Sequence, residues 1–260
     1  MRMLPGAVEA MALHDAELPQ MDYLCGCFWA TLALRLLSDA EVTQDDVGVA
    51  AGSSISSGPD PGSFPPGEVG RRDYRHELPA LDPAISGTAP SGLVRATAAL
   101  SGGTVEAIPV CGPFGDDDVH RLLTGLSALD DALVVSLNVA TRFFWGARPT
   151  PRQVVEHLQE GRNAGPPPDW DVGHLVGAFG LIEGARGTLV LIGDTYRSLG
   201  ANATYLQPVE RVAASLRRDG MPTSGGVLVY CASDASARVR NALAGFELAL
   251  WDNGSPDLAP

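Results

Sequence analysis

A cysteine at the start of an apolar helix is the residue of this chain best suited to do chemistry. Cys25 stands in residues 20–30 (QMDYLCGCFWA), directly before Gly26 and a run of apolar side chains. A thiol at a helix N-terminus lies among unpaired N–H groups and at the positive end of the helix dipole, and both favour the thiolate. The thiolate is the nucleophilic form of cysteine. The segment therefore predicts an activated thiol at Cys25, and Gly26 leaves room for a substrate backbone near its sulfur.

Helical spacing separates Cys25 from the second cysteine of the segment, Cys27. The face of Cys25 is apolar and carries Phe28, Trp29, Leu32 and Leu36. The nearly opposite face of Cys27 carries Thr31, Arg35 and Ser38. A single cleft is therefore open to only one of the two thiols, and the spacing favours Cys25. The alternative interpretation is that Cys25 is a small core residue of the apolar stripe, as free cysteines often are.

A histidine and an aspartate stand at the two ends of a predicted hairpin in residues 170–194 (WDVGHLVGAFGLIEGARGTLVLIGD). His174 lies near the start of the first strand, and Asp194 ends the second. A three-residue loop at 183–185 or 184–186 places both side chains on one face, whereas an even-length loop places them on opposite faces. A carboxylate that holds an imidazole fixes its tautomer and supports its positive charge. The alternative is that both residues are polar ends of strands beside a solvated turn.

Together the two segments resemble the papain-like cysteine peptidases, in particular the C39-type (bacteriocin-processing) peptidases. That family has a glutamine before a Cys-Gly pair at the start of an apolar helix, and later a Gly-His strand that enters a hairpin ending in Asp. The matching residues here are Gln20, Cys25, Gly26, Gly173, His174 and Asp194. The resemblance implies that Cys25 is the nucleophile, His174 the general base and acid, and Asp194 the orienting carboxylate. It also implies that Gln20 forms an oxyanion hole with the N–H of Cys25.

Three features differ from this family pattern or extend it. Gln20 is one position closer to Cys25 than the family's glutamine, and Asp194 is followed by Thr195 where the family has proline. The tripeptide Cys27-Phe28-Trp29 is similar to the Cys-Trp of papain itself, which keeps Cys27 open as an alternative nucleophile. Residues 40–165 resemble no family, and their role is left open.

The elements that position these residues follow from hydrophobic spacing and turn signals. We predict helices at 6–17, 25–38, 91–100, 117–126 (capped by Asp116), 150–159 (with a Thr150 cap and a first-turn proline) and 208–218. We predict strands at 104–110, 131–138, 172–182, 187–194 and 227–231, and a strand or helix at 243–251. His14 and His157 are expected on exposed helix faces. Because helices come early and strands late, the pattern favours an α+β fold.

The predicted fold is a papain-like one, in which the thiol helix packs on an antiparallel sheet that carries the His/Asp hairpin. Residues 1–260 are expected to form a single domain. Residues 52–91 are rich in glycine, proline and serine, and we predict an irregular, mobile insert or lid there because such a sequence buries little apolar surface.

Composition excludes several classes of chemistry. All 18 basic residues are arginine, so a Schiff-base lysine, a pyridoxal phosphate anchor and a P-loop lysine are absent. The net charge of −13 argues against nucleic-acid and membrane-surface binding and favours neutral or basic substrates. The four cysteines are too few for a disulfide scaffold, and the first twenty residues lack a signal-peptide pattern. We expect a cytoplasmic protein that uses neither cofactor nor metal.

Three functions are consistent with these residues. The first is a thiol hydrolase that cleaves a peptide or amide bond through a Cys25 acyl-enzyme. The second passes the same acyl group to an amine or thiol, as in a transferase or cyclase that tailors ribosomally made peptides. The third is a non-catalytic module that binds a peptide or peptide-like partner. The oligomeric state is not defined by the sequence.

Overall fold

One antiparallel sheet organises the structure, a computed structural model that describes residues 1–38 and 40–258. The strands are β1 (Arg2–Met3), β2 (Ile55–Ser56), β3 (Ala80–Leu81), β4 (Val105–Val110), β5 (Leu133–Ala140), β6 (Gly173–Glu183), β7 (Thr188–Gly193), β8 (Thr204–Pro208) and β9 (Gly226–Ala232). The helices are α1 (Ala7–Glu17), α2 (Cys25–Leu37), α3 (Gln44–Ala51), α4 (Pro90–Leu100), α5 (Asp118–Ser127), α6 (Pro151–Glu160), α7 (Val209–Arg217) and α8 (Ser236–Ala242), with 3-10 turns at Pro61–Ser63 and Thr141–Phe143.

The main sheet has the strand order β4-β9-β5-β6-β7-β8, and β1 pairs with β6. Every pair in this sheet is antiparallel. The central strand β5 (LVVSLNVA) is buried along its whole length, because apolar side chains point to both faces and both faces are covered. The predicted α+β class is confirmed, while β8 was not predicted from the sequence.

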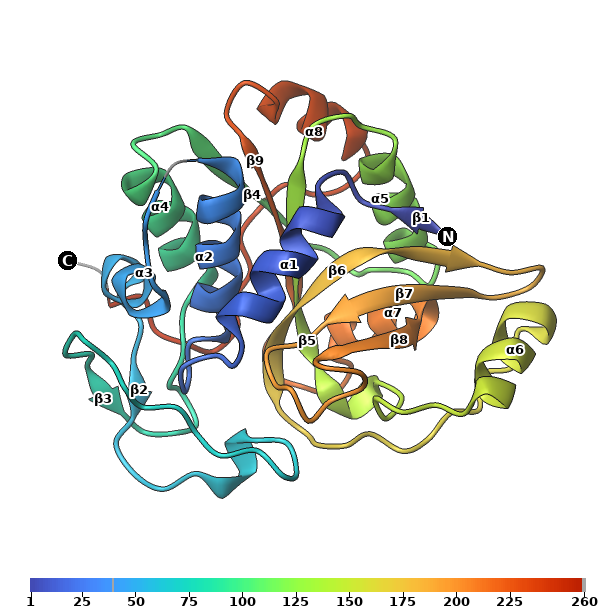
Figure 1. Cartoon of the computed structure of the whole chain (residues 1–260), viewed down its shortest axis with the longest axis horizontal. Coiled ribbons are helices and arrows are strands. Elements are labelled where there is room, and N and C mark those ends of the chain that lie inside the picture. The colour runs from blue at the N-terminus through green and yellow to red at the C-terminus, as the bar shows by residue number, and fades with distance from the viewer. Residues whose placement is uncertain (39, 259–260) are drawn as a thin grey trace.

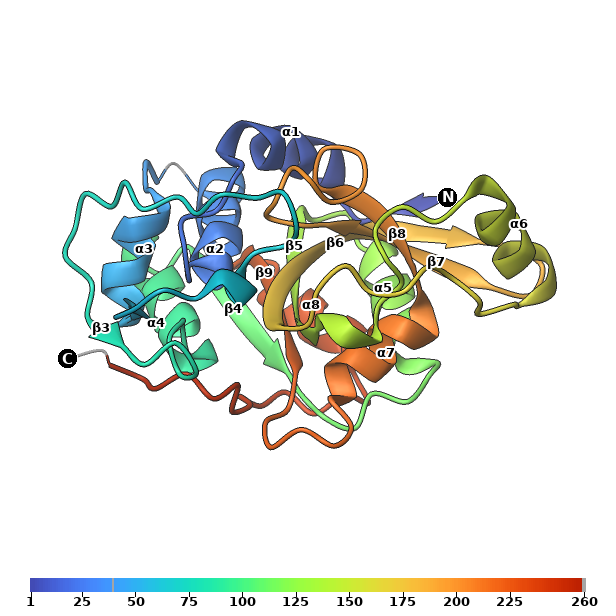
Figure 2. The same ribbon diagram turned by 90° about the horizontal axis from the view of Figure 1, so that it is seen from below.

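Helices cover both faces of the sheet. Helices α1 and α2 pack on one face, against β5 and β6, and α5 and α7 pack on the other (Figures 1 and 2). Helix α2 is buried from Gly26 to Leu34. Its Trp29 lies so close to the sheet that a Cβ at Gly177 would come within 2.2 Å of the indole ring. Glycine at Gly177 is therefore required for α2 to sit at this depth.

Helices α3 and α4 complete the side of the molecule that carries α2 (Figure 1). Helix α3, which was not predicted, begins with a capping box between Thr43 and Asp46. The face of α2 that bears Cys27 packs toward this layer, since the Cys27 Sγ lies 3.3 Å from the Ser53 Oγ. Cys27 and Thr31 of this face are thus buried, while Arg35 and Ser38 are half-buried. The reason is that α2 is a central helix between the sheet and a second helical layer.

Residues 52–91 are mostly irregular, as predicted, and contain the short parallel pair β2–β3. This segment, called the strap below, is held by polar contacts to the chain just before α2. The buried Asp22 accepts hydrogen bonds from the Arg71 N–H and the Arg72 Nε, each at 2.7 Å. The Tyr74 hydroxyl donates to the Asp22 carbonyl at 2.8 Å. Mobility of the strap stays a prediction.

Other sequence predictions are confirmed or corrected. Helix α6 begins with Pro151 behind a Thr150 cap, as predicted. Asp116 does not cap α5. It pairs instead with Arg217, and Asp117 precedes the helix without a side-chain cap. Residues 243–251 of the described structure contain an isolated bridge at Glu247 rather than a helix or strand.

His14 and His157 are buried rather than exposed as expected. In each of them a ring nitrogen forms a hydrogen bond with a main-chain carbonyl oxygen inside the molecule.

Within the described part of the chain, no helix combines the length and the apolar character needed to cross a membrane.

Candidate active site

A pocket of about 520 Å³ opens where the N-terminus of α2 meets the start of β6. Cys25 and Gln20 line it from the α2 side, and His174 lines it from the sheet. The strap supplies a further wall, and residues 221–223 and 253–255 supply another. The structure therefore brings together Gln20, Cys25 and His174 around one accessible space.

The Cys25 thiol and the His174 imidazole interact directly. Burial raises the pKa of Cys25, but the hydrogen bond and the charge of His174 outweigh it, so the pKa lies below that of a free cysteine. The N–H groups of Leu175 and Gly26 act in the same direction. Burial lowers the pKa of His174, but the Asp194 charge and its hydrogen bond, together with Cys25, raise the pKa to about 10. These directions describe a thiolate beside an imidazolium.

His174 and Asp194 lie in contact on one face of the hairpin, as predicted, but not for the predicted reason. The loop between β6 and β7 spans Gly184–Gly187, four residues rather than three, and an even-length loop alone would separate the two side chains. A β-bulge at Phe179 shifts the register from Gly180↔Leu191 to Ala178↔Ile192. The extra residue reverses the alternation once more. His174 is consequently diagonal to Asp194 on the same face.

Asp194 is fully buried and holds the imidazole through its Oδ1, which lies 3.1 Å from the His174 Nε2. The same oxygen accepts from the Thr195 N–H, and Oδ2 accepts from the Tyr205 hydroxyl at 2.6 Å. Burial raises the pKa of Asp194, but the charge of His174 and these hydrogen bonds lower it below the usual range. Tyr205 comes from β8, so a strand that was not predicted supplies the second anchor of the carboxylate.

Thr195 links the imidazole to Gln20. Its hydroxyl donates to the Gln20 Oε1 at 2.6 Å and lies 3.2 Å from the His174 Nε2. Because the Thr195 proton is given to Gln20, the threonine oxygen accepts from the imidazole Nε2–H. That arrangement leaves Nδ1 for Cys25. It also directs the Gln20 amide nitrogen away from Thr195, and Gln20 lines the pocket.

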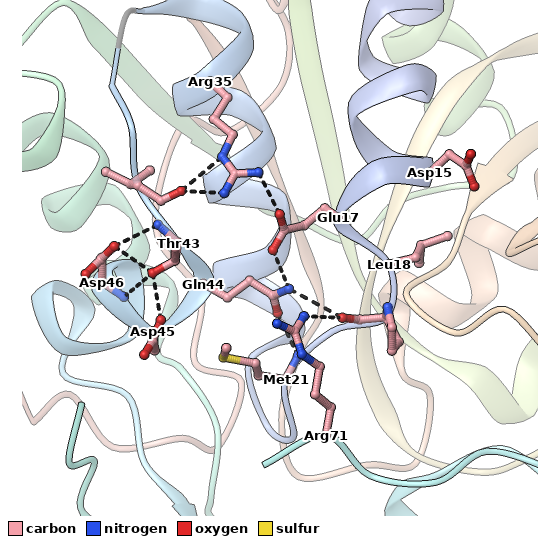
Figure 3. Close-up of polar contacts among 12 residues, drawn as sticks. Asp15, Glu17, Leu18, Met21, Arg35, Thr43, Gln44, Asp45, Asp46 and Arg71 are labelled. Carbon is pink, nitrogen blue, oxygen red and sulfur yellow. Dashed lines mark hydrogen bonds and ion pairs between the residues drawn. The ribbon is translucent and has the colours of Figure 1, made fainter. Parts of the chain in front are cut away.

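The side chain of Gln44 in α3 forms hydrogen bonds with Glu17 and Met21, which precede and follow Gln20 in the chain (Figure 3). The Gln44 Oε1 accepts from the Met21 N–H at 2.7 Å, and the Gln44 Nε2 donates to Glu17 at 2.7 Å. Arg71 of the strap donates to the Pro19 carbonyl at 3.0 Å. These contacts fix the backbone directly before and after Gln20, and α3 thereby acquires a role that the sequence did not indicate.

Aromatic rings shield the imidazole from water. The Tyr196 ring stacks on His174 with centroids 6.1 Å apart, and Trp170 meets His174 edge-on at 5.1 Å. Tyr196 is buried, and both aromatic residues line the pocket. Such apolar cover lowers the local dielectric and strengthens the contact between imidazole and carboxylate.

Cys27 lies outside the pocket. It is fully buried, and desolvation raises its pKa to about 11 despite its hydrogen bonds with Ser53 and Thr88. The structure therefore favours Cys25 over Cys27 as the accessible, ionisable thiol. All four cysteines are free thiols.

The site contains three residues that sequence reasoning did not assign. Thr195 follows Asp194 directly, and the available signal was that it stands where the C39-type peptidases have proline. Tyr196 and Arg218 line the pocket as well, and Arg218 directly follows α7. Neither belongs to a motif, so only the folded chain reveals their position.

The sequence profile of a family of unknown function (DUF6885) matches residues 4–252. The chain belongs to this family. No curated protein matches it. The matched range includes Gln20, Cys25, His174 and Asp194, so the whole site lies within the family domain.

Proposed function

We propose that this protein is a papain-like thiol enzyme that breaks an acyl bond in a peptide or peptide-like substrate through a Cys25 acyl-enzyme. The observation that carries the proposal is a single connected site. The helix-start thiol of Cys25 contacts His174, and Asp194 holds the far nitrogen of that imidazole at 3.1 Å. The same arrangement of nucleophile, base and orienting group is found in hydrolases and acyltransferases with unrelated folds.

In the first step the Cys25 thiolate attacks the substrate carbonyl and forms a tetrahedral intermediate. The imidazolium of His174 then gives its proton to the leaving amine as the C–N bond breaks, which leaves a thioester on Cys25. Asp194 keeps the ring in place and stays ionised, as the lowered pKa of its carboxyl requires.

Gln20 is the proposed donor to the oxyanion. Its Oε1 is occupied by Thr195, so its amide N–H groups remain for a ligand in the pocket. The N–H of Cys25, at the first turn of α2, is the second donor implied by the resemblance. Two such donors stabilise the charge that develops on the carbonyl oxygen in the transition state.

In the second step the thioester is released by water or by another nucleophile. Neutral His174 removes a proton from the attacking water, which yields a carboxylic acid and restores the thiol. An amine in place of water yields a new amide, which is the reaction of a transferase or cyclase. Both outcomes require the same site. The papain-like arrangement and a reducing, cytoplasmic environment for the free thiols belong to this proposal.

An activated ester tests the proposal without knowledge of the native substrate. Mixed with p-nitrophenyl acetate, the wild-type protein is expected to release a burst of p-nitrophenolate close to one equivalent per chain, because Cys25 is acetylated once before slow deacylation. The Cys25→Ala and His174→Gln variants are expected to lose the burst, while Cys27→Ala keeps it. Added glycinamide distinguishes transfer from hydrolysis by the appearance of N-acetylglycinamide.

The binding-module alternative makes the opposite prediction. If folded wild-type protein shows no burst, or if Cys25→Ala retains it, the proposed nucleophile is wrong. Circular dichroism spectra of the variants serve as the control for folding, since a lost burst in an unfolded variant says nothing about the thiol.

A further inference from the structure

Arg218 is a buried cation at the wall of the same pocket, and no carboxylate of the described residues pairs with it. The residue is 3% exposed, and it lines the pocket together with Cys25 and His174. The guanidinium lies against the backbone beside the imidazole, because a Cβ at Gly173 would come within 3.6 Å of its Nη2. Arg218 therefore brings a positive charge close to the reacting groups.

The contacts of Arg218 are all neutral. Its Nη2 donates to the Asn138 Oδ1 at 2.6 Å and to the Val139 carbonyl at 3.3 Å, and its Nη1 donates to the Thr223 Oγ1 at 3.1 Å. The buried Nε–H has no hydrogen-bond partner within residues 1–38 and 40–258. These bonds hold the guanidinium in one orientation, and none of them comes from a carboxylate.

Unlike Arg218, every buried carboxylate among the described residues forms an ion pair. Asp22, Asp45 and Asp194 each pair with an arginine or histidine at 2.7, 3.9 and 3.1 Å. Arg218 forms no ion pair with any described residue, although the chain carries 31 acidic side chains. A buried charge without a partner costs several kcal/mol, so a protein keeps one only where something else compensates it.

The backbone of Arg218 adds a second cost. The residue is the C-cap of α7 and lies in the left-handed region, with φ 52° and ψ 44°, a conformation that favours glycine. Strained residues of this kind persist mainly at ligand sites and switches. Burial lowers the pKa of Arg218 to about 10, and the Cys25 thiolate acts against that shift. The guanidinium nevertheless stays protonated at neutral pH.

We infer that Arg218 is an anion subsite that binds a carboxylate of the substrate beside the scissile bond. The inference rests on the proposed function, because it assigns the substrate class of that site. The carboxylate is either the free C-terminus of a peptide or an acidic side chain next to the cleaved bond. Arginine suits either one, since its planar fork matches a carboxylate.

This subsite would favour an acidic group inside the pocket, whereas the net charge of the whole chain favours neutral or basic substrates. A net charge of −13 repels anions from the surface and favours neutral or basic substrates. A cation inside the pocket selects an acidic group only after the rest of the substrate has entered. The acidic group then fixes the substrate's direction relative to Cys25.

Two alkylating agents of nearly equal size test the subsite directly. Iodoacetate is an anion and iodoacetamide is neutral, and both alkylate a thiolate with loss of iodide. At a pH where Cys25 is fully ionised, we expect the ratio of the iodoacetate rate to the iodoacetamide rate at Cys25 to exceed the ratio for the urea-unfolded chain by roughly tenfold. Imidazolium contributes to this ratio, so the variants decide the role of the arginine.

In Arg218→Gln we expect the ratio to fall severalfold while the iodoacetamide rate stays within about twofold. Arg218→Lys keeps the charge and is expected to keep most of the ratio, and Arg152→Gln, an exposed arginine of α6, is the matched control. An unchanged ratio in folded Arg218→Gln overturns the subsite. Failure of wild-type Cys25 to react with iodoacetamide instead contradicts the proposed function, so the two failures are distinguishable.

Protection of the wild-type protein needs no variant and separates the two sources of carboxylate. N-acetyl-dialanine and its C-terminal amide are compared as protectants of Cys25 against iodoacetamide, beside N-acetylglutamate α-amide. Stronger protection by N-acetyl-dialanine than by its amide indicates that the subsite binds a C-terminal carboxylate. Stronger protection by N-acetylglutamate α-amide than by the dialanine amide indicates that it binds an acidic side chain. Equal protection by all three, or none by any, overturns the inference.

Discussion

The His174 Nε2 lies 3.1 Å from the Asp194 Oδ1 because a one-residue bulge at Phe179 compensates for a four-residue loop. Without the bulge, the alternation of strand side chains would place the imidazole and the carboxylate on opposite faces of the sheet. The same aspartate also accepts from Tyr205 and the Thr195 N–H. The carboxylate is thus fixed from three directions before any substrate is bound.

Cys25 is expected to be the thiol that reacts fastest with limiting iodoacetamide near neutral pH. Its pKa is lowered by His174, whereas burial raises the pKa of Cys27 to about 11. Peptide mass spectrometry of the labelled chain gives the order of reaction, and Cys25→Ala and Cys27→Ala are the matched pair. Preferential labelling of Cys27, Cys111 or Cys231 contradicts the assignment.

The pH dependence of this reaction is expected to depend on His174. In the wild type, the iodoacetamide rate rises with the thiolate fraction and has a midpoint below that of a free cysteine. His174→Gln removes the imidazolium, the main factor that lowers the pKa, and leaves burial, which raises it. The midpoint should therefore move upward by roughly one to three pH units.

The control for this shift is His120→Gln, a change at a half-exposed histidine of α5 that should leave the midpoint unchanged. An unshifted midpoint in folded His174→Gln would show that the imidazole does not act on the thiol.

Gln20→Ala is expected to separate acylation from alkylation. Attack on an ester carbonyl creates an oxyanion, so loss of the Gln20 donor should slow the p-nitrophenyl acetate burst by roughly 10²- to 10³-fold. Displacement of iodide creates no oxyanion, so the iodoacetamide rate at Cys25 should change little. Stopped-flow absorbance measures the first rate and mass spectrometry the second.

The exposed Gln159→Ala on α6 is the matched glutamine control. Equal losses in both reactions would indicate that Gln20 only supports the fold around Cys25, and no loss in either would remove it from the oxyanion hole.

Tyr205→Phe is expected to lower the free energy of unfolding by about 2 kcal/mol, because it removes a buried hydrogen bond to a charged carboxylate. Urea unfolding followed by circular dichroism measures the loss. Tyr74→Phe removes a bond to the neutral Asp22 carbonyl and should cost less, about 1 kcal/mol. If the two variants lose equal stability, the charge of Asp194 adds nothing to the Tyr205 bond.

Limited proteolysis is expected to cleave the strap, residues 52–91, before other parts of the chain, and Asp22→Asn should accelerate this cleavage severalfold. The substitution leaves Arg72 without its buried anionic partner and weakens the bond from the Arg71 N–H. Asp131→Asn, which breaks the exposed pair with Arg238, is the control. First cleavage outside the strap in wild-type protein would show that the strap is as firmly ordered as the rest of the fold.

The sequence by itself determined the local elements of the site. A helix that starts at Cys25, a hairpin from His174 to Asp194 and a helix capped by Thr150 all follow from hydrophobic spacing, cap residues and turn residues. These signals act between residues close in the chain, so they can be read without knowing the fold. They identified Cys25, His174 and Asp194 as candidate residues, and the resemblance to the C39-type peptidases added Gln20 and joined the four as one group.

Only the tertiary structure decided how these elements meet. The bulge at Phe179 occurs where the partners of β6 change, since Gly180 pairs with β1 and Ala178 with β5. The hydrogen bond from Thr195 to Gln20 joins residues 175 positions apart. The charge of Arg218 becomes relevant to the site only because the fold places it beside the pocket of Cys25 and His174. Such contacts depend on packing between distant segments, and no short-range pattern in the sequence records them.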